Sequence, residues 1–530
     1  MNPHVFLGAI ALVAMLAGGC YRSHGFDAGD LSDGDLPDSR VRDSGSGDGA
    51  RPDGAPVDSG RRDSGFLDSG RPDTGAPDGG LPDGGVLTRC ATDSDCSGAC
   101  VRAPGVAAVD LARLDLACGP ATAASSDGAL CDTNADCGRG LCVVAGSCVA
   151  PCVVDGDCGP RQRCTELWVR TSSSALQWLN GCVDRVNAPP DVHVSRGRAG
   201  VVRGADTPDT LSLAHAPGTQ VMVLEPELPQ TLYASRFRTS ETPAVMLFDA
   251  EGYAGDGPPP LAPFGTPGPV LSILMPNGPR ARRSPAGYGL DLYSDSRTPV
   301  FVTSMSRERI GHTLDLDLFY VGARGLAPSG DRGPARIADA LATVERVCAR
   351  FGVRLGVVRQ HEIVGQLQRD FAVIEGTSDG SLPEMPELLR LSAGAGRSSV
   401  SLFLVREVSL ALGVAGGIPG PESIHGTGSS GILIAVDLHD PTADDLGYTM
   451  AHEIGHFLGL WHTTEYDGSI YEPLPDTLRC PRSLDADGDG YVMPEECAAN
   501  DGYNLMFWAG VGETLSPQQS DLLAHAPLLY

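Results

Sequence analysis

The sequence contains no lysine, so all 39 of its basic side chains are arginine. Acidic residues outnumber them at 67, which gives a formal net charge of −28 at pH 7. Binding to nucleic-acid phosphates depends on clustered positive charge, whereas strong acidity mainly keeps a protein soluble. We therefore exclude nucleic acid as a partner. The missing lysine is interpreted as a bias in genome composition.

Long apolar runs are also missing. The run from Val5 to Leu16 is too short to span a bilayer and is followed by small residues, which is typical of a signal peptide over residues 1–19. Ala17-Gly18-Gly19-Cys20 resembles a bacterial lipobox, so we expect Cys20 to be lipidated. The predicted location is the bacterial cell envelope, lipid-anchored at the surface, with ordinary secretion as the alternative.

Residues 20–89 contain very few apolar side chains. Asp, Gly, Ser, Pro and Arg dominate this segment, in near-repeats such as Pro52-Asp53-Gly54 and Asp63-Ser64-Gly65. Such a segment cannot bury a core, and we predict a disordered linker that tethers the folded part to a membrane. Calcium binding by the Asp-Gly repeats is disfavoured because they have no nonapeptide period.

Cysteine is concentrated in residues 90–189. An even number of cysteines at short spacing in an exported chain predicts disulfides. A Cys-x5-Cys phrase recurs there with an acid directly before its second cysteine. A metal cluster is the alternative, but the stretch from the first cysteine to the last has no histidine and no Cys-x2-Cys pair. We predict small disulfide repeats with unknown connectivity, formed by cysteines 90, 96, 100, 118, 131, 137, 142, 148, 152, 158, 164 and 182.

Residues 190–311 are predicted to form an all-β sandwich module. Short runs rich in β-forming residues recur there between turn signals. The expected strands are Gln220–Leu224, Thr231–Phe237, Ala244–Phe248, Val270–Met275, Tyr288–Tyr293 and Val300–Ser304.

Residues 312–530 mix strand and helix signals. Leu314–Val321 alternates like a half-buried strand, and Ile337 to Phe351 carries apolar residues at helical spacing. Further strands are expected at Val353–Val358, Ser399–Val405 and Gly431–Val436. Cys348 lies on the apolar side of the helix and is interpreted as a core thiol, with a latch on a metal as the lesser alternative.

The most informative stretch is His452-Glu453-Ile454-Gly455-His456-Phe457-Leu458-Gly459-Leu460-Trp461-His462. Residues four apart lie on one face of a helix, so His452 and His456 can direct ring nitrogens at one ion. Gly459 can adopt the left-handed conformation that ends a helix, which would bring His462 back as a third ligand. Zinc then keeps an open position for water, and Glu453 is placed as general base and acid.

This pattern resembles the signature of the metzincin metallopeptidases, His-Glu-x-x-His-x-x-Gly-x-x-His, without substitution. The resemblance implies zinc-dependent hydrolysis of peptide bonds. It also implies a methionine turn beneath the metal, for which Met506 is the candidate. Trp508 stands where several metzincin families have a tyrosine, so we assign no tyrosine role. Thr463 does not decide the subfamily, and a pappalysin-like one is our working interpretation.

The expected fold class is multidomain: an α+β metzincin-like catalytic domain over residues 312–530, preceded by the β-sandwich module, the cysteine-rich repeats and the disordered linker. Strand, helix, strands and zinc helix follow one another as in the upper half of a metzincin domain. One strand is expected at the cleft edge, where an extended substrate could pair with it.

A second metal signal lies in residues 485–496. Its acids at positions 1, 3 and 5, glycine at position 6 and glutamate at position 12 fit a calcium loop. An acidic turn without a metal is the alternative. Cys480 and Cys497 bracket the loop and are expected to form a disulfide. The candidate calcium residues are Asp485, Asp487, Asp489, Tyr491 and Glu496.

The resemblance implies a zinc endopeptidase with proteins or peptides as substrates, and the N-terminal segment predicts that it is lipid-anchored at the cell surface or secreted. The rival hypothesis is a surface adhesion or binding lipoprotein whose metal site is vestigial. A metal-dependent hydrolase that acts on another kind of bond is the third.

Overall fold

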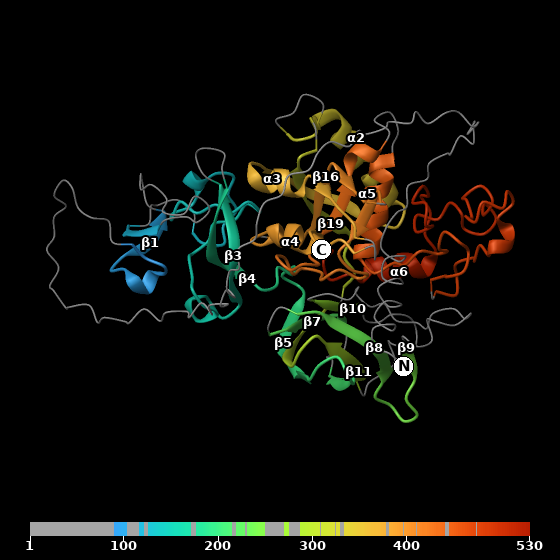
Figure 1. Cartoon of the computed structure of the whole chain (residues 1–530), viewed down its shortest axis with the longest axis horizontal. Helices are drawn as coiled ribbons and strands as arrows, with labels where there is room; N and C mark the ends of the chain where they lie inside the picture. Colours follow the sequence, from blue (N-terminus) through green and yellow to red (C-terminus); the bar gives the residue numbers. More distant parts are fainter. Residues whose placement is uncertain are drawn as a thin grey trace, which may run out of the picture. The chain divides into compact units, whose positions relative to one another are not determined.

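The computed structural model describes residues 89–102, 116–120, 126–170, 176–214, 219–227, 230–249, 270–274, 287–307, 309–323, 325–328, 333–377, 381–395, 397–409, 411–439, 445–472 and 474–530 (Figure 1). The predicted signal peptide, the lipidation site Cys20 and all but the last residue of the predicted linker lie outside them. The described residues form a mixed α/β structure, mostly of strands, with a disulfide-rich N-terminal region. Among them no helix is both long and apolar enough to cross a membrane.

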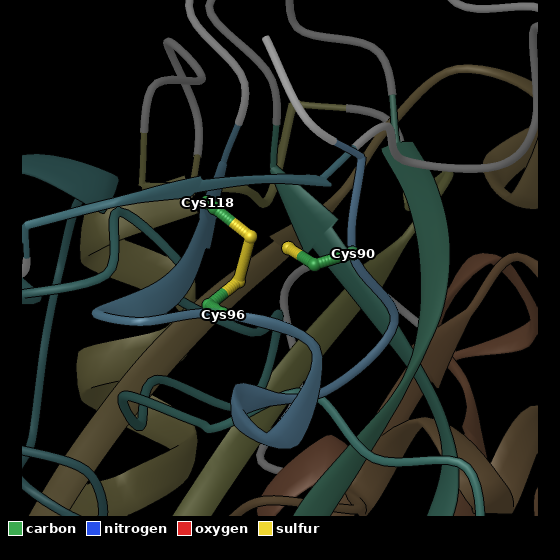
Figure 2. A group of neighbouring side chains, drawn as sticks. All are labelled: Cys90, Cys96 and Cys118. Carbon is green, nitrogen blue, oxygen red and sulfur yellow. A yellow bond between two sulfur atoms is a disulfide. The ribbon is translucent and has the colours of Figure 1, made fainter. Parts of the chain in front are cut away.

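The cysteines between residues 90 and 182 form six disulfides, which confirms the prediction from their spacing. They fall into three repeats of four, and each repeat pairs its first cysteine with its third and its second with its fourth. Figure 2 shows one of these bonds, Cys96–Cys118, with Cys90 beside it. The pairs are Cys90–Cys100, Cys96–Cys118, Cys131–Cys142, Cys137–Cys148, Cys152–Cys164 and Cys158–Cys182.

Each repeat has one 3-10 turn between its first two cysteines. In the first repeat the acid before the second cysteine, Asp95, accepts backbone N–H groups from Ala91 and Thr92 at 2.8 and 2.9 Å. The first residue of that turn, Asp93, accepts the N–H of the third cysteine, Cys100, at 2.8 Å. The same hydrogen bonds recur in the other two repeats. The acid before the second cysteine therefore stabilises the turn by accepting backbone N–H groups. The turns are η1 (Asp93–Asp95), η2 (Asn134–Asp136) and η3 (Asp155–Asp157).

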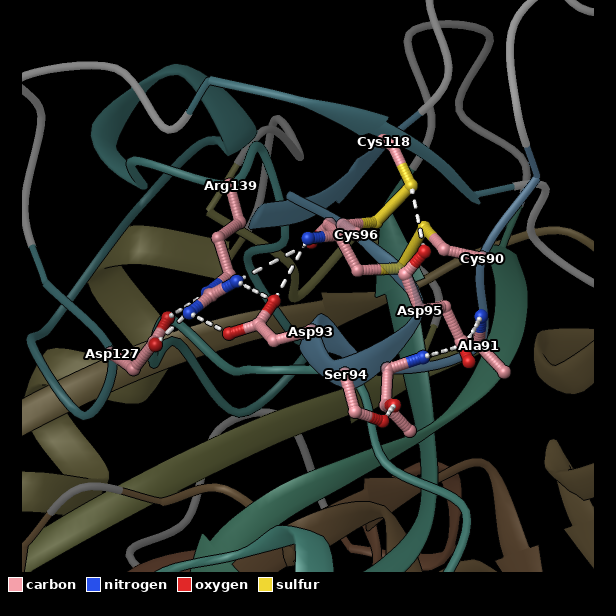
Figure 3. A network of polar contacts seen from close by, with 11 residues as sticks. Cys90, Ala91, Asp93, Ser94, Asp95, Cys96, Cys118, Asp127 and Arg139 are labelled. Atoms are coloured by element: carbon pink, nitrogen blue, oxygen red, sulfur yellow. Dashed lines mark hydrogen bonds and ion pairs between the residues drawn. A yellow bond between two sulfur atoms is a disulfide. The ribbon is translucent and has the colours of Figure 1, made fainter. Parts of the chain in front are cut away.

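Arg139 joins the first repeat to the second (Figure 3). Its guanidinium donates to both carboxylate oxygens of Asp93, at 2.6 and 2.8 Å, and to Asp127 at 2.9 Å. Burial alone would raise the pKa of Asp93, but the hydrogen bonds from Arg139 and the Cys100 N–H lower it. Two antiparallel pairs complete the region: β1 (Ala99–Arg102) with β2 (Leu116–Gly119), and β3 (Gln162–Arg170) with β4 (Leu176–Asp184).

Two four-stranded antiparallel sheets follow, with strand orders β10-β7-β12-β5 and β6-β11-β8-β9. Side chains of both sheets share one core, where Phe237 stacks on Tyr288 at 5.1 Å between ring centroids. All six predicted strands are present. Strands β5 and β6 were missed, and β5 is mostly exposed and rich in Arg and Gly, so it carries no apolar alternation. The strands are β5 (His193–Val202), β6 (Asp209–Leu213), β7 (Thr219–Pro226), β8 (Leu232–Thr239), β9 (Met246–Asp249), β10 (Leu271–Leu274), β11 (Tyr288–Ser294) and β12 (Thr298–Ser306).

The C-terminal part is built on a five-stranded sheet of order β14-β13-β16-β19-β18. Four strands are parallel, and β18 pairs antiparallel with β19 and forms an edge. Strand β18 was not predicted from the sequence because it has only three residues. The module boundaries at residues 190 and 312 stay predictions. The strands are β13 (Thr313–Val321), β14 (Arg354–Ile363), β16 (Val400–Val405), β18 (Gly413–Ala415) and β19 (Ile432–Ala435), with a small pair β15 (Val373–Ile374) and β17 (Glu407–Val408) beside them.

Both faces of this sheet are covered. Alternate residues of the parallel strands enter two different cores, as Leu318 and Phe319 of β13 do. Helices α2 (Gly333–Ala349) and α5 (Asp445–Phe457) lie on the first face (Figure 1). The other elements are α3 (Gln366–Phe371), α4 (Met385–Leu389), α6 (Pro517–Ala524), η6 (Arg390–Ser392), η7 (Val436–Leu438) and η8 (Arg482–Leu484).

The expectation that Leu314–Val321 is half-buried is wrong, because every residue of β13 is buried. The two acids that suggested a solvent face have partners inside the protein. Asp317 accepts from His361 at 2.7 Å and from Ser399 at 2.5 Å. Asp315 accepts from the backbone N–H of Val357 at 2.7 Å. Buried carboxylates with donors can replace apolar residues without exposing the strand.

The second face of the sheet is covered in part by the cysteine-rich repeats. Val143 and Leu167 belong to the same buried cluster as Phe319 and Phe403. Arg359 donates to the carbonyl of Gly146 at 2.9 Å across this contact. The second and third repeats therefore share a core with the five-stranded sheet.

Candidate metal centre

Helix α5 carries the first two histidines and ends where the third is needed. The N–H of Leu460 donates to the carbonyl of Gly455, and that of Gly459 to the carbonyl of His456, both at 2.9 Å. With φ of 102° at Gly459, this is a Schellman ending, which requires a glycine at the left-handed position. The chain reverses there, and His462 returns toward the helix.

The three histidines converge. Nε2 of His462 lies 3.1 Å from Nε2 of His452 and 3.1 Å from Nε2 of His456. All three side chains are buried, with at most 2% of the surface of any residue exposed. The structure therefore brings together the three residues predicted to bind zinc, in one closely spaced group of potential ligand atoms.

Each ring has a hydrogen-bond acceptor at its other nitrogen. Nδ1 of His452 faces the carbonyl of Leu505 at 2.6 Å, and Nδ1 of His456 faces the carbonyl of Leu460 at 2.8 Å. Nδ1 of His462 faces a carboxylate oxygen of Glu465 at 3.0 Å. Because carbonyl and carboxylate oxygens only accept, these contacts assign the proton to Nδ1 of each neutral ring. Nε2 of each ring then carries a lone pair and can bind a metal ion.

Burial keeps the imidazoles of His452 and His456 neutral. Desolvation, reinforced by His462, lowers the pKa of His452 to about 3, although its hydrogen bond to Leu505 opposes the shift. Desolvation and the two neighbouring histidines lower the pKa of His456 well below its usual value. Neutral imidazole is the form that binds metal, so no proton has to leave these two rings at neutral pH.

This geometry fits a metal ion. Three converging lone pairs repel one another unless a cation lies between them. Nitrogens about 2.0–2.1 Å from a tetrahedral zinc would lie about 3.3–3.4 Å apart, close to the spacing between His462 and the other two rings. Nitrogen ligands in a trio suit zinc better than calcium, which prefers oxygen. The residues present therefore fit zinc.

Glu453 follows the first histidine on α5 and is fully buried. It lies against Gly413 of the edge strand β18, where an added Cβ would stand only 2.6 Å from Cγ of Glu453. The predicted general base is thus held between helix α5 and the edge of the sheet. Sequence reasoning did not single out Gly413, because the contact exists only in the folded chain.

Met506 lies against helix α5. A Cβ at Gly455 would be 2.5 Å from the Met506 sulfur, so the helix and the methionine touch at a glycine. The backbone around Met506 is tied to the site, since Thr463 N–H donates to its carbonyl at 2.8 Å. The preceding carbonyl, that of Leu505, accepts from His452. Met506 therefore lies where a methionine turn is predicted.

Trp508 points away from the histidines. Its indole N–H donates to the carbonyl of Val492 at 2.6 Å, and its ring packs with Phe507 and the disulfide Cys480–Cys497. Val492 belongs to the predicted calcium loop. The residue that replaces a tyrosine in the family pattern thus joins the methionine turn to that loop.

The predicted calcium residues converge in part. Carboxylate oxygens of Asp485, Asp487 and Glu496 gather within 4.8 Å of one another. Asp489 instead accepts from the backbone N–H of Tyr491 at 2.8 Å. The loop holds its shape through backbone donors, such as Gly490 N–H to Asp485 at 3.1 Å. Oxygen ligands of this kind suit calcium.

One residue near the site was missed from sequence. Glu465 stands three residues after His462 and is 4% exposed, and this spacing was the only signal the sequence offered. His439 lies outside the motif and is a buried histidine with hydrogen-bond partners at both ring nitrogens. Its Nε2 contacts Thr449 of α5 at 2.9 Å, and burial lowers its pKa to about 4. Cys348 is a free, buried thiol in the sheet core, as expected.

Comparison with known proteins adds little. No protein-family model matches the chain, and no curated protein matches it either. Among solved structures, the chain is similar to metalloproteinase-II from Bacteroides fragilis, with 12% sequence identity and a TM-score of 0.20. That match covers 58% of this chain and 84% of the other. A TM-score this low says nothing about function, which has to be inferred from the geometry of the site.

Proposed function

We propose that this protein is a zinc-dependent endopeptidase of the metzincin type, with a pappalysin-like subfamily as the working assignment. The observation that carries the proposal is the approach of His462 Nε2 to within 3.1 Å of the Nε2 atoms of both His452 and His456, next to a buried glutamate. His452, His456 and His462 would hold the zinc, which when bound activates water and polarises a carbonyl.

The chain's own residues supply the remaining chemistry. Glu453 would accept a proton from the attacking water and deliver it to the leaving amine, so one carboxylate serves both steps. Burial between α5 and β18 keeps this carboxylate in place and limits competing water. Met506 would support the ligands from below, because its own carbonyl accepts from Thr463 N–H and the carbonyl before it, that of Leu505, accepts from His452.

Protein and peptide substrates are favoured by the edge strand. The side of β18 that does not pair with β19 could accept an extended chain by β-strand addition. Gly413 on this strand touches Glu453, so a substrate paired there would run past the catalytic carboxylate. A substrate bound along β18 could thus present a peptide bond to the site.

Calcium is proposed as a second, structural metal at residues 485–496. Its candidate ligands are Asp485, Asp487 and Glu496, with Asp489 and Tyr491 as weaker candidates because they are not among the converging carboxylates. The hydrogen bond from Trp508 to the carbonyl of Val492 joins this loop to the methionine turn, so an ordered loop would stabilise the turn.

The location proposed is the cell envelope, with lipid at Cys20 and residues 20–89 as the tether, or else secretion. Neither nucleic acid nor a membrane-spanning helix enters this proposal. The cysteine repeats would then serve as part of the folded enzyme, since they share a core with its sheet.

The test is zinc content and hydrolysis of unfolded protein substrates, measured on the full chain and on Glu453→Gln. We expect bound zinc in both proteins and activity in the wild type only, because the variant keeps the ligands but loses the base. Active Glu453→Gln would contradict the assigned mechanism. Zinc without activity on any peptide substrate would favour a vestigial site in an adhesion protein or a hydrolase for another bond.

A further inference from the structure

The three zinc-ligand candidates do not have equivalent partners. His452 and His456 each donate their Nδ1 proton to a backbone carbonyl, which is neutral. His462 donates to Glu465, which carries a charge. The carboxylate of Glu465 is buried, so water screens it little.

From this asymmetry we infer that Glu465 is the residue that positions His462 and strengthens it as a zinc ligand. The inference rests on the proposed zinc site and adds a residue to it. A carboxylate behind a metal-binding imidazole fixes the ring's tautomer and direction and makes the other nitrogen a better donor.

His462 needs this support more than the other two ligands do. His452 and His456 are held by the rigid backbone of α5, whereas His462 lies beyond the helix end at Gly459. No helical hydrogen bonds fix the direction of its ring. The carboxylate of Glu465 therefore orients the ligand that the helix does not hold.

Glu465 is itself held in place. Its backbone N–H donates to the carbonyl of Ile470, and its carbonyl accepts from Gly468, both at 2.9 Å. Gly468 in turn packs tightly against Arg482, where a Cβ would meet the Arg482 nitrogen. The neighbouring Thr464 accepts from Cys480 N–H at 3.1 Å. The turn is thus fixed to the chain around the Cys480 disulfide, and the carboxylate has a defined direction.

The charges at the proposed zinc site also favour this role for Glu465. A divalent cation among three neutral imidazoles would leave two positive charges in a buried site. The two carboxylates would balance them, Glu453 beside the ligands and Glu465 through the ring of His462. A buried charge is costly unless it is compensated, so Glu465 should favour the metal-loaded state.

The experiment measures zinc affinity of the full chain by competition with a chromophoric chelator, and the rate of zinc release. Glu465→Ala should bind zinc about 10–100-fold more weakly than wild type, which is the usual effect of losing such a partner. Glu465→Gln keeps an acceptor oxygen but loses the charge, so we expect an intermediate loss. Asp467→Asn is the matched control: this carboxylate lies two residues further on, bonds to Ser469, and should leave affinity unchanged.

Substitution by cobalt gives a second readout, because its visible spectrum reports ligand geometry and would change in the Glu465 variants alone. Wild-type zinc affinity in a folded Glu465→Ala or Glu465→Gln protein would overturn the inference while leaving the proposed function intact. If the wild-type chain itself binds no zinc in the same titration, the proposed function fails, and the inference fails with it.

Discussion

Gly413→Ala should impair catalysis while leaving zinc bound. A Cβ at this position would lie 2.6 Å from Cγ, 3.0 Å from Cδ and 2.9 Å from Oε1 of Glu453. Non-bonded carbons prefer about 3.5–4.0 Å, so the glutamate has to retreat by about 1 Å. The backbone at Gly413 lies outside the left-handed region, so alanine itself fits the strand.

A displacement of about 1 Å at a reacting group can cost about 100-fold in rate, or roughly 2.7 kcal/mol of transition-state stabilisation. The assay is kcat/KM for an unfolded protein substrate, with zinc content measured on the same sample. Gly197→Ala is the matched control, because a Cβ there meets nothing within 4 Å. Undiminished kcat/KM in zinc-loaded Gly413→Ala would refute the placement of Glu453 as the base beside the edge strand.

Two further outcomes are expected. Burial raises the pKa of Glu422 to about 8 from a usual 4.5, despite a hydrogen bond from Leu528. Folded protein thus keeps a proton that unfolded protein releases, and stability falls as pH rises between these values, by about 1 kcal/mol per unit. Urea unfolding of Glu422→Gln across that range should show a weaker fall. A calcium-selective chelator, added with free zinc held constant, should reduce peptidase activity. The variant Trp508→Phe should reduce it as well, because it removes the hydrogen bond to the loop. Full peptidase activity in both experiments would contradict a structural role for the calcium loop.

The zinc helix could be predicted from sequence because all of its determinants are local. Four-residue spacing places His452 and His456 on one face, and Gly459 provides the turn that returns His462. Met506 could be proposed only from a family resemblance, since nothing local marks a methionine that touches a glycine in α5.

Other features depend on contacts between distant segments. The spacing of the cysteines predicted disulfides but not their crossed pairing, because sequence does not reveal which sulfurs the folded repeat brings together. The alternation of Leu and Asp in β13 suggested a solvent face, because sequence does not reveal that His361 and Ser399 supply donors to Asp317. Gly413 was passed over because β18 has only three residues.

The crossed pairing in the cysteine repeats would have a consequence if the protein has the proposed peptidase activity. In the second repeat the bonds Cys131–Cys142 and Cys137–Cys148 enclose overlapping loops. A single break anywhere between Cys131 and Cys148 therefore falls inside at least one closed loop, and the two pieces stay covalently joined. Molecules nicked there by their own neighbours would keep their mass on a non-reducing gel and separate only after reduction.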